Sequence, residues 1–174
     1  TAMLPRASTI QEIRDRFRWD IPARYNIAYD ACDRWAALEP DRVAIIHQEP
    51  SGQVRRLTYG AMAEASNRLA NVFTAYGVER GDRIALLLPQ APETAITHMA
   101  AYKCGAIALP LAALFGVEAL AYRLANSGAK AIITNRAGLM KLDEIREKLG
   151  SVRVILSTSR SEERRVGKEC RSRW

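Results

Sequence analysis

Two histidines and two of the three cysteines are the residues of this chain that we consider first for acid–base, nucleophilic or metal chemistry. His47 lies in a segment predicted to be a strand, and His98 lies in one predicted to be a helix. Neither has a serine, cysteine or carboxylate arranged as a nucleophile partner. Zinc ligands usually come in closely spaced pairs, and Cys32, His47, His98 and Cys104 lack that spacing. The sequence therefore predicts no catalytic residue and no metal ligand.

The sequence also contains no glycine-rich motif of the kind that binds phosphate. Such loops present backbone N–H groups to the phosphate oxygens. Gly77 and Gly81 do not form a G-x-G-x-x-G sequence, and Gly167-Lys168 lacks the earlier glycine of a Walker loop. Trp19 and Trp35 are more typical of packing anchors than of a platform for stacking a ligand. We therefore assign no cofactor-binding residue.

The elements that would position these side chains alternate regularly between Leu57 and Thr134. Amphipathic helices are predicted after Thr58, from Pro92 to Cys104 and from Val117 to Ser127. Apolar strands are predicted at 83–88, at 106–109, where Pro110 should stop the strand, and at 131–134. Continuous apolar strands separated by such helices indicate a largely parallel sheet with helices on both faces. The predicted fold class is α/β.

Further elements are expected on either side of this block. A helix capped by Asn26 or Asp30 should run through Leu38, and a hairpin should join strands at 43–47 and 54–57. Asn135 should cap a helix that runs to Gly150, and a last strand is expected at 152–156. Residues 1–14 contain few apolar side chains, so we expect them to be poorly ordered.

Short motifs at the joints of this block resemble the N-terminal part of the AMP-forming acyl-CoA synthetases, within the adenylate-forming superfamily. They occur in register along the chain: Leu57-Thr58-Tyr59, Gly77-Val78-x-x-Gly81-Asp82-Arg83, Leu88-Pro89-Gln90-x-Pro92-Glu93, Tyr102-Lys103-x-Gly105-Ala106-x-x-Leu109-Pro110-Leu111 and Leu124-x-x-Ser127-Gly128-Ala129-Lys130. Phe17 to Asn26 and Phe115-Gly116 are similar to the acetyl-CoA and medium-chain branch. The resemblance covers about residues 15–157. Ala61 departs from it, because the family more often has a glutamate there that could complete a capping box with Thr58.

This resemblance implies an incomplete N-terminal subdomain of an enzyme that joins a carboxylic acid to coenzyme A with ATP and Mg²⁺. The family's phosphate loop, adenine loop, ribose-binding aspartate and lid lysine lie beyond the matching part, so the chain itself is expected to be inactive and to bind none of these cofactors. Arg136 and Lys141 could approach a phosphate of coenzyme A at the carboxyl edge of the sheet, although a solvated helix face is the preferred interpretation. Two alternatives remain open, an adenylate-forming ligase for aryl acids and an α/β binding module without catalysis.

Residues 160–174 differ from everything that precedes them. They show no apolar period, and their fifteen residues resemble the in-frame translation of a common sequencing-library adapter. The chain also begins at Thr1 without an initiator methionine. We therefore expect a gene fragment with three parts: residues 1–14, a partial N-terminal domain at 15–159, and an artefactual tail at 160–174.

Composition narrows the functional classes further. The chain has 26 Lys and Arg and 19 Asp and Glu residues, a net charge of +7. The tail contributes six basic and three acidic residues, which leaves +4 scattered over residues 1–159 and disfavours a nucleic-acid partner. The longest apolar run, 105–116, is too short for a membrane span. Two widely separated cysteines outside the tail favour a cytoplasmic location, and the oligomeric state cannot be inferred.

Overall fold

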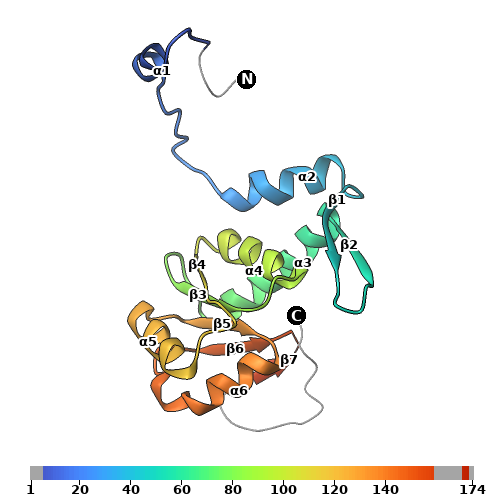
Figure 1. Ribbon diagram of the computed structural model, residues 1–174, viewed down its shortest axis with the longest axis vertical. Helices are drawn as coiled ribbons and strands as arrows, with labels where there is room; N and C mark the ends of the chain where they lie inside the picture. Colours follow the sequence, from blue (N-terminus) through green and yellow to red (C-terminus); the bar gives the residue numbers. More distant parts are fainter. Residues whose placement is uncertain (1–5, 159–169, 173–174) are drawn as a thin grey trace.

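A five-stranded parallel sheet forms the centre of the molecule (Figure 1). The computed structural model describes residues 6–158 and 170–172. The strand order is β4-β3-β5-β6-β7. The strands are β3 (Arg83–Leu87), β4 (Ile107–Pro110), β5 (Ala131–Thr134), β6 (Val154–Ser157) and β7 (Cys170–Ser172). The register pairs Leu86 of β3 with Pro110 of β4 on one side and with Ile133 of β5 on the other, so the carboxyl ends of these strands meet at one edge of the sheet.

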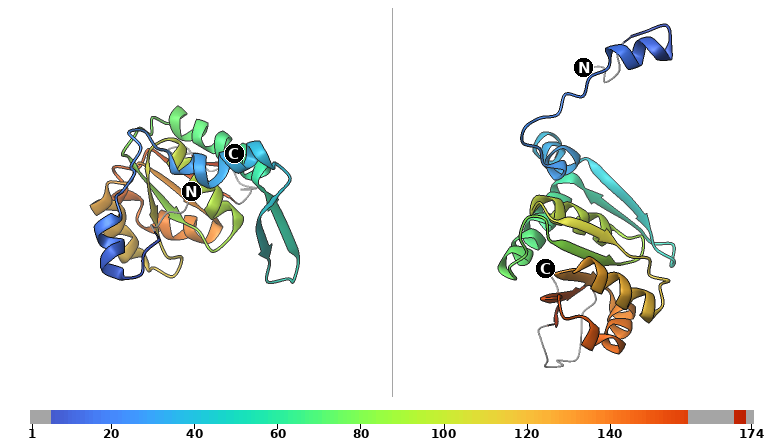
Figure 2. Two further views of the ribbon diagram at one scale, coloured as in Figure 1. Left: turned by 90° about the horizontal axis from the view of Figure 1, so that it is seen from above. Right: turned by 90° about the vertical axis from the view of Figure 1, so that its left-hand side faces the viewer.

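Helices cover both faces of this sheet, as the sequence predicts. On one face α3 (Tyr59–Ala75) and α4 (Pro92–Lys103) bury an apolar cluster that includes Leu69, Phe73 and Ile84. On the other face α5 (Val117–Ser127) and α6 (Arg136–Glu144) bury a second cluster that includes Leu120 and Ile132. Figure 2 shows the sheet between the two pairs of helices. The predicted α/β class is confirmed, because strands buried on both faces need helices on each side.

Local sequence signals define the ends of these helices. The Thr58 side chain accepts a hydrogen bond of 3.2 Å from the N–H of Ala61 at the start of α3. The Asn135 side chain accepts one of 2.9 Å from the N–H of Gly138 in α6. Both side chains satisfy an N–H that has no partner within the helix. Gly128 ends α5 at a φ of 61°, a left-handed conformation that glycine adopts without steric penalty.

An antiparallel hairpin and an N-terminal arm precede the sheet. The hairpin joins β1 (Val43–Gln48) to β2 (Val54–Thr58). Before it, the chain forms α1 (Ile10–Arg16), a π-helical turn η1 (Tyr29–Asp33) and α2 (Arg34–Leu38). Figure 1 shows α1 in dark blue, separated from the sheet by an extended segment. No residue of α1 is buried.

Four details differ from the sequence-based expectations. The strand expected at 106–109 runs from Ile107 to Pro110, so it ends at the proline but includes it, because β4 is an edge strand in which the missing proline N–H needs no partner. The helix expected up to Gly150 ends at Glu144, and a 3₁₀ turn η2 (Arg146–Lys148) follows. Residues 10–14 are helical although poor order was expected for 1–14, because Thr9 caps α1. Residues 170–172, in the tail, pair with β6; β7 lies where β6 would otherwise be an unpaired edge.

Most of the expected tail at 160–174 lies outside the described residues, which leave out 159–169 and 173–174 as well as 1–5. Within the described part, no helix combines the length and the apolar character that crossing a membrane requires.

Candidate functional site

A cavity of about 570 Å³ lies at the carboxyl edge of the sheet. Its walls come from the ends of β3 and β4, the first half of α4 and strand β1 of the hairpin. The lining residues are Ile45, His47, Leu86, Leu88, Gln90, Ala91, Thr94, Ala95, His98, Pro110, Leu111 and Ala112. Ligands of parallel α/β sheets bind at this edge, and the volume falls within the range of small-molecule sites. This cavity is therefore the candidate functional site.

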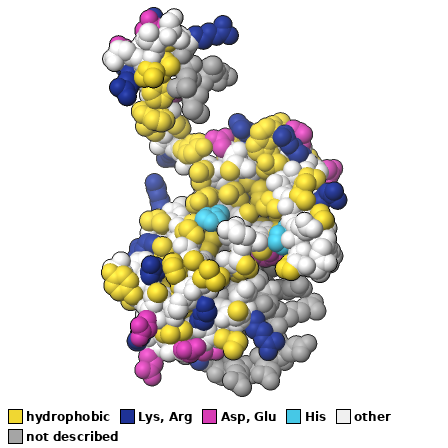
Figure 3. All heavy atoms as spheres, viewed as in Figure 1, with side chains coloured by type: hydrophobic (Ala, Val, Ile, Leu, Met, Phe, Trp, Pro, Cys, Tyr) yellow, Lys and Arg dark blue, Asp and Glu magenta, His cyan; other side chains and the backbone are white. Residues whose placement is uncertain are grey.

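The cavity brings together the two histidines that are 51 positions apart in the chain. Nδ1 of His98 lies 3.2 Å from the hydroxyl oxygen of Tyr102, one helical turn further along α4. Partial burial lowers the pKa of His98 below its ordinary value, because burial disfavours the charged imidazolium. Figure 3 shows the histidine side chains in cyan on one face of the molecule, among apolar side chains. The sequence did not predict this proximity.

The hairpin is held over α4 by an ion pair. Nη2 of Arg55 in β2 lies 3.2 Å from Oε1 of Glu93 in the first turn of α4. Nη1 of the same arginine lies 3.7 Å from Oε1 of Glu49. Thr94 donates a hydrogen bond of 2.7 Å to the carbonyl of Pro89, which fixes the turn between β3 and α4. The contact between Arg55 and Glu93 links segments 38 positions apart, and the hairpin that it holds contributes β1 as one wall of the cavity.

The loop after β4 forms another wall and is fixed by two basic side chains. Lys141 of α6 donates hydrogen bonds from Nζ to the carbonyl oxygens of Ala113, at 2.7 Å, and Phe115, at 2.9 Å. The guanidinium of Arg123 lies 4.2 Å from the centre of the Phe115 ring, a cation–π distance. Leu114 at the tip of the loop remains 95% exposed. The expectation of a solvated face is therefore wrong for Lys141, because its ammonium group binds the loop.

The fold and this cavity can now be compared with known proteins. The family described as AMP-binding enzyme matches residues 32–173. The chain belongs to this family. The AMP-binding assignment confirms the resemblance seen in the sequence, and it covers the cavity walls together with both pairs of helices.

Curated relatives and solved structures agree with the AMP-binding family. Acetyl-coenzyme A synthetase from Phycomyces blakesleeanus is 37% identical over 122 residues, which are 69% of this chain and 18% of that enzyme. The Streptomyces coelicolor acetyl-coenzyme A synthetase is 32% identical over 167 residues, which are 90% of this chain and 26% of that enzyme. The Brucella canis acyl-CoA synthetase structure superposes with a TM-score of 0.74 at 29% identity, covering 84% of this chain and 26% of that one. This chain thus spans about a quarter or less of the length of these relatives.

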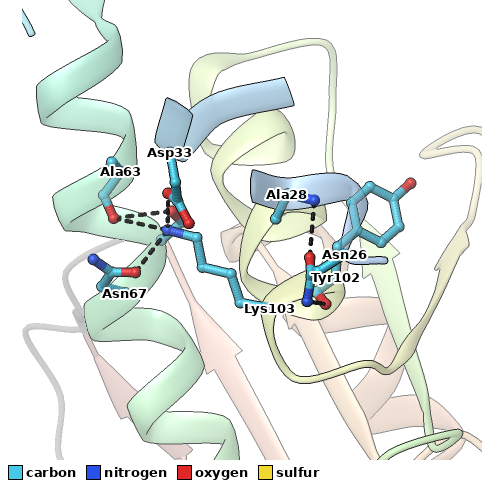
Figure 4. A network of polar contacts seen from close by, with 8 residues as sticks. Asn26, Ala28, Asp33, Ala63, Asn67, Tyr102 and Lys103 are labelled. Atoms are coloured by element: carbon cyan, nitrogen blue, oxygen red, sulfur yellow. Dashed lines mark hydrogen bonds and ion pairs between the residues drawn. The ribbon is translucent and has the colours of Figure 1, made fainter. Parts of the chain in front are cut away.

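A cluster of polar side chains lies at the other end of α4 (Figure 4). The side chain of Lys103 is only 11% exposed and lies 2.7 Å from Asp33 of η1. It also donates to the side-chain oxygen of Asn67 at 2.6 Å and to the carbonyl of Ala63 at 3.3 Å. A buried ammonium group is unfavourable unless it is paired in this way. The cluster joins α4, α3 and the N-terminal arm, so we interpret it as structural.

The remaining candidates have packing roles or none. Cys32 is fully buried and Cys104 half-buried; both are free, and burial raises the pKa of each thiol. Trp35 packs with its ring centre 6.1 Å from that of Tyr59, as expected for an anchor. Trp19 is 77% exposed, so its assignment as an anchor is wrong; it lies in the extended arm and contacts Phe17.

Proposed function

We propose that this chain is the N-terminal part of an ATP-dependent, AMP-forming ligase that joins a carboxylic acid to coenzyme A. The main support for this proposal is the match of residues 32–173 to the AMP-binding enzyme family, together with similar proteins named acetyl-coenzyme A synthetase. The fold supports the proposal, because the candidate cavity lies where parallel α/β sheets bind ligands.

The proposed reaction has two steps. A carboxylate oxygen attacks the α-phosphorus of ATP, pyrophosphate leaves, and an acyl-adenylate forms. The thiolate of coenzyme A then attacks the acyl carbonyl carbon, and the bond to AMP breaks to give the thioester. Both steps develop negative charge on oxygen, which preorganised hydrogen-bond donors and cations stabilise.

Mg²⁺ is part of the proposal, but the described residues do not fit a site for it. Nowhere in 6–158 do three His, Cys, Asp or Glu side chains gather in a group able to hold a metal ion. We therefore derive no step through a metal from this chain. Its described residues supply the walls of the cavity and the sheet that supports them.

The two alternative functions are less well supported. The family match disfavours an α/β binding module without chemistry. A ligase for aryl acids shares the adenylation step, but the similar enzymes named above are acetyl-coenzyme A and acyl-CoA synthetases. A cytoplasmic location is also part of the proposal, supported by the two free thiols of Cys32 and Cys104.

The test of this function is a pair of measurements. The gene should be read past the codon for residue 159, where a Ser/Thr- and Gly-rich loop ending near Pro-Lys is expected and a stop codon would contradict the ligase. The longer protein should release pyrophosphate from ATP only when a carboxylic acid is present. The 174-residue chain alone should release none above a heat-inactivated control, and clear turnover by it would overturn its assignment as an incomplete part.

We also propose that residues 15–159 are the domain and that residues 160–174 are foreign to it. The support is that the tail resembles translated adapter sequence. Limited trypsin digestion should cut at Arg164 and Arg165 before any site in the domain, and it should leave the circular dichroism of the remainder unchanged. Protection of these two arginines would instead indicate that β7 holds the tail firmly on β6.

A further inference from the structure

The extended segment that follows α1 carries apolar side chains at every second position. Phe17, Trp19 and Ile21 alternate with the charged Arg18 and Asp20. Successive side chains of an extended chain point to opposite sides, so the three apolar side chains share one side. The rings of Phe17 and Trp19 agree with this arrangement, because their centres lie 4.9 Å apart. We call this amphipathic segment the strap.

The apolar side of the strap faces solvent. Trp19 and Ile21 are both largely exposed. Figure 3 shows apolar side chains, in yellow, along the segment that connects α1 to the rest of the molecule. Single exposed apolar residues are ordinary on protein surfaces, but apolar side chains gathered on one side mark a surface that binds another. The strap is therefore suited to packing against an apolar partner.

A groove of about 540 Å³ follows the strap directly in the sequence. Its two tyrosines, Tyr25 and Tyr29, are exposed, so their rings can contact a partner. Asp30 is already engaged, because it lies 3.6 Å from Arg34 and its hydrogen bond to Tyr25 raises the pKa of that hydroxyl. The groove thus offers aromatic surface rather than a free carboxylate. The lining residues are Pro22, Arg24, Tyr25, Asn26, Tyr29 and Asp30.

The balance of charge in this region argues against two classes of partner. Residues 17–30 contain two arginines, Arg18 and Arg24, and two aspartates, Asp20 and Asp30, so their net charge is zero. Nucleic acids and anionic membranes are bound through an excess of Lys and Arg. A protein surface with apolar side chains is the partner that fits the strap and the groove.

The similar enzymes indicate where that protein surface lies. This chain spans 26% or less of their length, so about three quarters of such a protein lies outside it. A surface within the same polypeptide is present at an effective concentration in the millimolar range. That concentration favours the remainder of the ligase over a second copy of this chain.

We propose that the strap and the adjoining groove form a docking surface for the part of the ligase that follows residue 159. The proposal rests on the proposed function, because that function requires a longer protein. Trp19, Ile21, Tyr25 and Tyr29 are exposed in the 174-residue chain. In the longer protein these four side chains pack against apolar side chains of the downstream part.

Trypsin digestion with mass spectrometry tests the docking surface. In the 174-residue chain the bond after Arg24 lies in an exposed stretch, so it should be cut early. In the longer protein the same bond should be cut at least about tenfold more slowly at equal trypsin concentration, because cleavage follows the population of the undocked form. Equal rates in the two proteins would overturn the proposal. Protection that grows with the concentration of the 174-residue chain would assign the surface to a second copy instead.

Two double variants of the longer protein identify the side of the strap that docks. Trp19→Ser with Ile21→Ser removes the apolar side and should restore rapid cleavage after Arg24. Arg18→Ser with Asp20→Ser changes the opposite side without altering the net charge, and it should leave the bond protected. In the 174-residue chain neither pair should change the circular dichroism, because all four side chains are exposed there. Equal cleavage rates of the two double variants would show that the apolar side does not dock.

Failure of this inference and failure of the proposed function give different results. A longer protein that forms acyl-CoA, but is cut after Arg24 as fast as the 174-residue chain, leaves the ligase intact and refutes the docking surface. Protection of that bond in a longer protein that shows no carboxylate-dependent pyrophosphate release would do the opposite.

Discussion

The sheet and the N-terminal arm are built on different physical principles. In the sheet, strands such as β5 consist entirely of buried residues, and α3 to α6 cover both faces. In the arm, large apolar side chains are exposed instead, Ile10 by 72%, Trp19 by 77% and Ile21 by 76%. We call the sheet and helices α3 to α6 the body of the molecule. The arm is joined to this body where Ala28 and Cys32 are buried and where polar contacts form. Burial thus stabilises the body throughout, whereas the arm depends on one junction.

That junction consists of contacts with the last turn of α4. Asn26 donates a hydrogen bond of 2.8 Å to the carbonyl of Tyr102 and accepts one of 2.9 Å from the N–H of Ala28. Lys103 of α4 forms an ion pair with Asp33, which lies five residues after the buried Ala28. Substitutions in the body, at the junction and in the arm should therefore have effects of decreasing size.

The largest effect is expected inside the body, at Gly138 of α6. A Cβ atom there would lie 1.8 Å from Oγ1 of Thr134 and 3.1 Å from Cδ2 of Leu87, so the helix could not keep its distance from β5. Gly138→Ala should lower the free energy of unfolding by about 3 kcal/mol, as overpacking of a dense core does. Urea denaturation of the chain measures this change.

Gly150→Ala is the matched control for that substitution. A Cβ atom at Gly150 meets no atom within 4 Å, so the change should stay within about 0.5 kcal/mol. Equal effects of the two substitutions would contradict the close contact between α6 and β5.

A smaller loss is expected at the junction. Lys103→Met removes the ammonium group and leaves Asp33 without its partner. Breaking a fully buried pair costs about 3–5 kcal/mol, but the side chain of Asp33 is 34% exposed and retains some water, so we expect about 2 kcal/mol. Lys148→Met, on the exposed turn η2, should change the unfolding free energy little. Adding Asp33→Leu to Lys103→Met should recover part of the loss, and no recovery would contradict the pairing.

The sequence predicts the body better than the site. The ends of several helices could be predicted, because the residues that set them bond to or shape the backbone only a few positions away. These residues are Thr58, Asn135 and Gly128. The inclusion of Pro110 as the last residue of β4 could not be predicted, because its pairing in the sheet depends on β4 being an edge strand. The cavity depends on Arg55 meeting Glu93, 38 positions away, and no periodic pattern encodes that contact. The role of Lys141 was missed for the same reason, since its acceptors are backbone carbonyls of another loop.

A still smaller effect should appear as a pH dependence at His98. The pKa of His98 is lower in the folded chain than its ordinary value of 6.5, so the unfolded chain binds more protons in the window below that value. This part of the stability is present above about pH 6.5 and is lost as the pH falls toward the lowered pKa. His98→Gln should reduce the dependence of the urea midpoint on pH between about 7 and 5. An unchanged slope would indicate that His98 contributes nothing to it.

The smallest effect is expected in the arm. Removal of residues 1–20 deletes α1, which buries no residue, and Trp19, which is largely exposed. Little apolar surface returns to water, so the unfolding free energy should change by less than about 0.5 kcal/mol. Removal of residues 1–34 is the contrasting change, because it also deletes the buried Ala28 and Cys32, the Asn26 contact with Tyr102 and the partner of Lys103. That longer truncation should lower the urea midpoint clearly. If both truncations lowered it equally, residues 6–20 would contribute to the stability of the body, and the distinction between the buried junction and the exposed arm would be wrong.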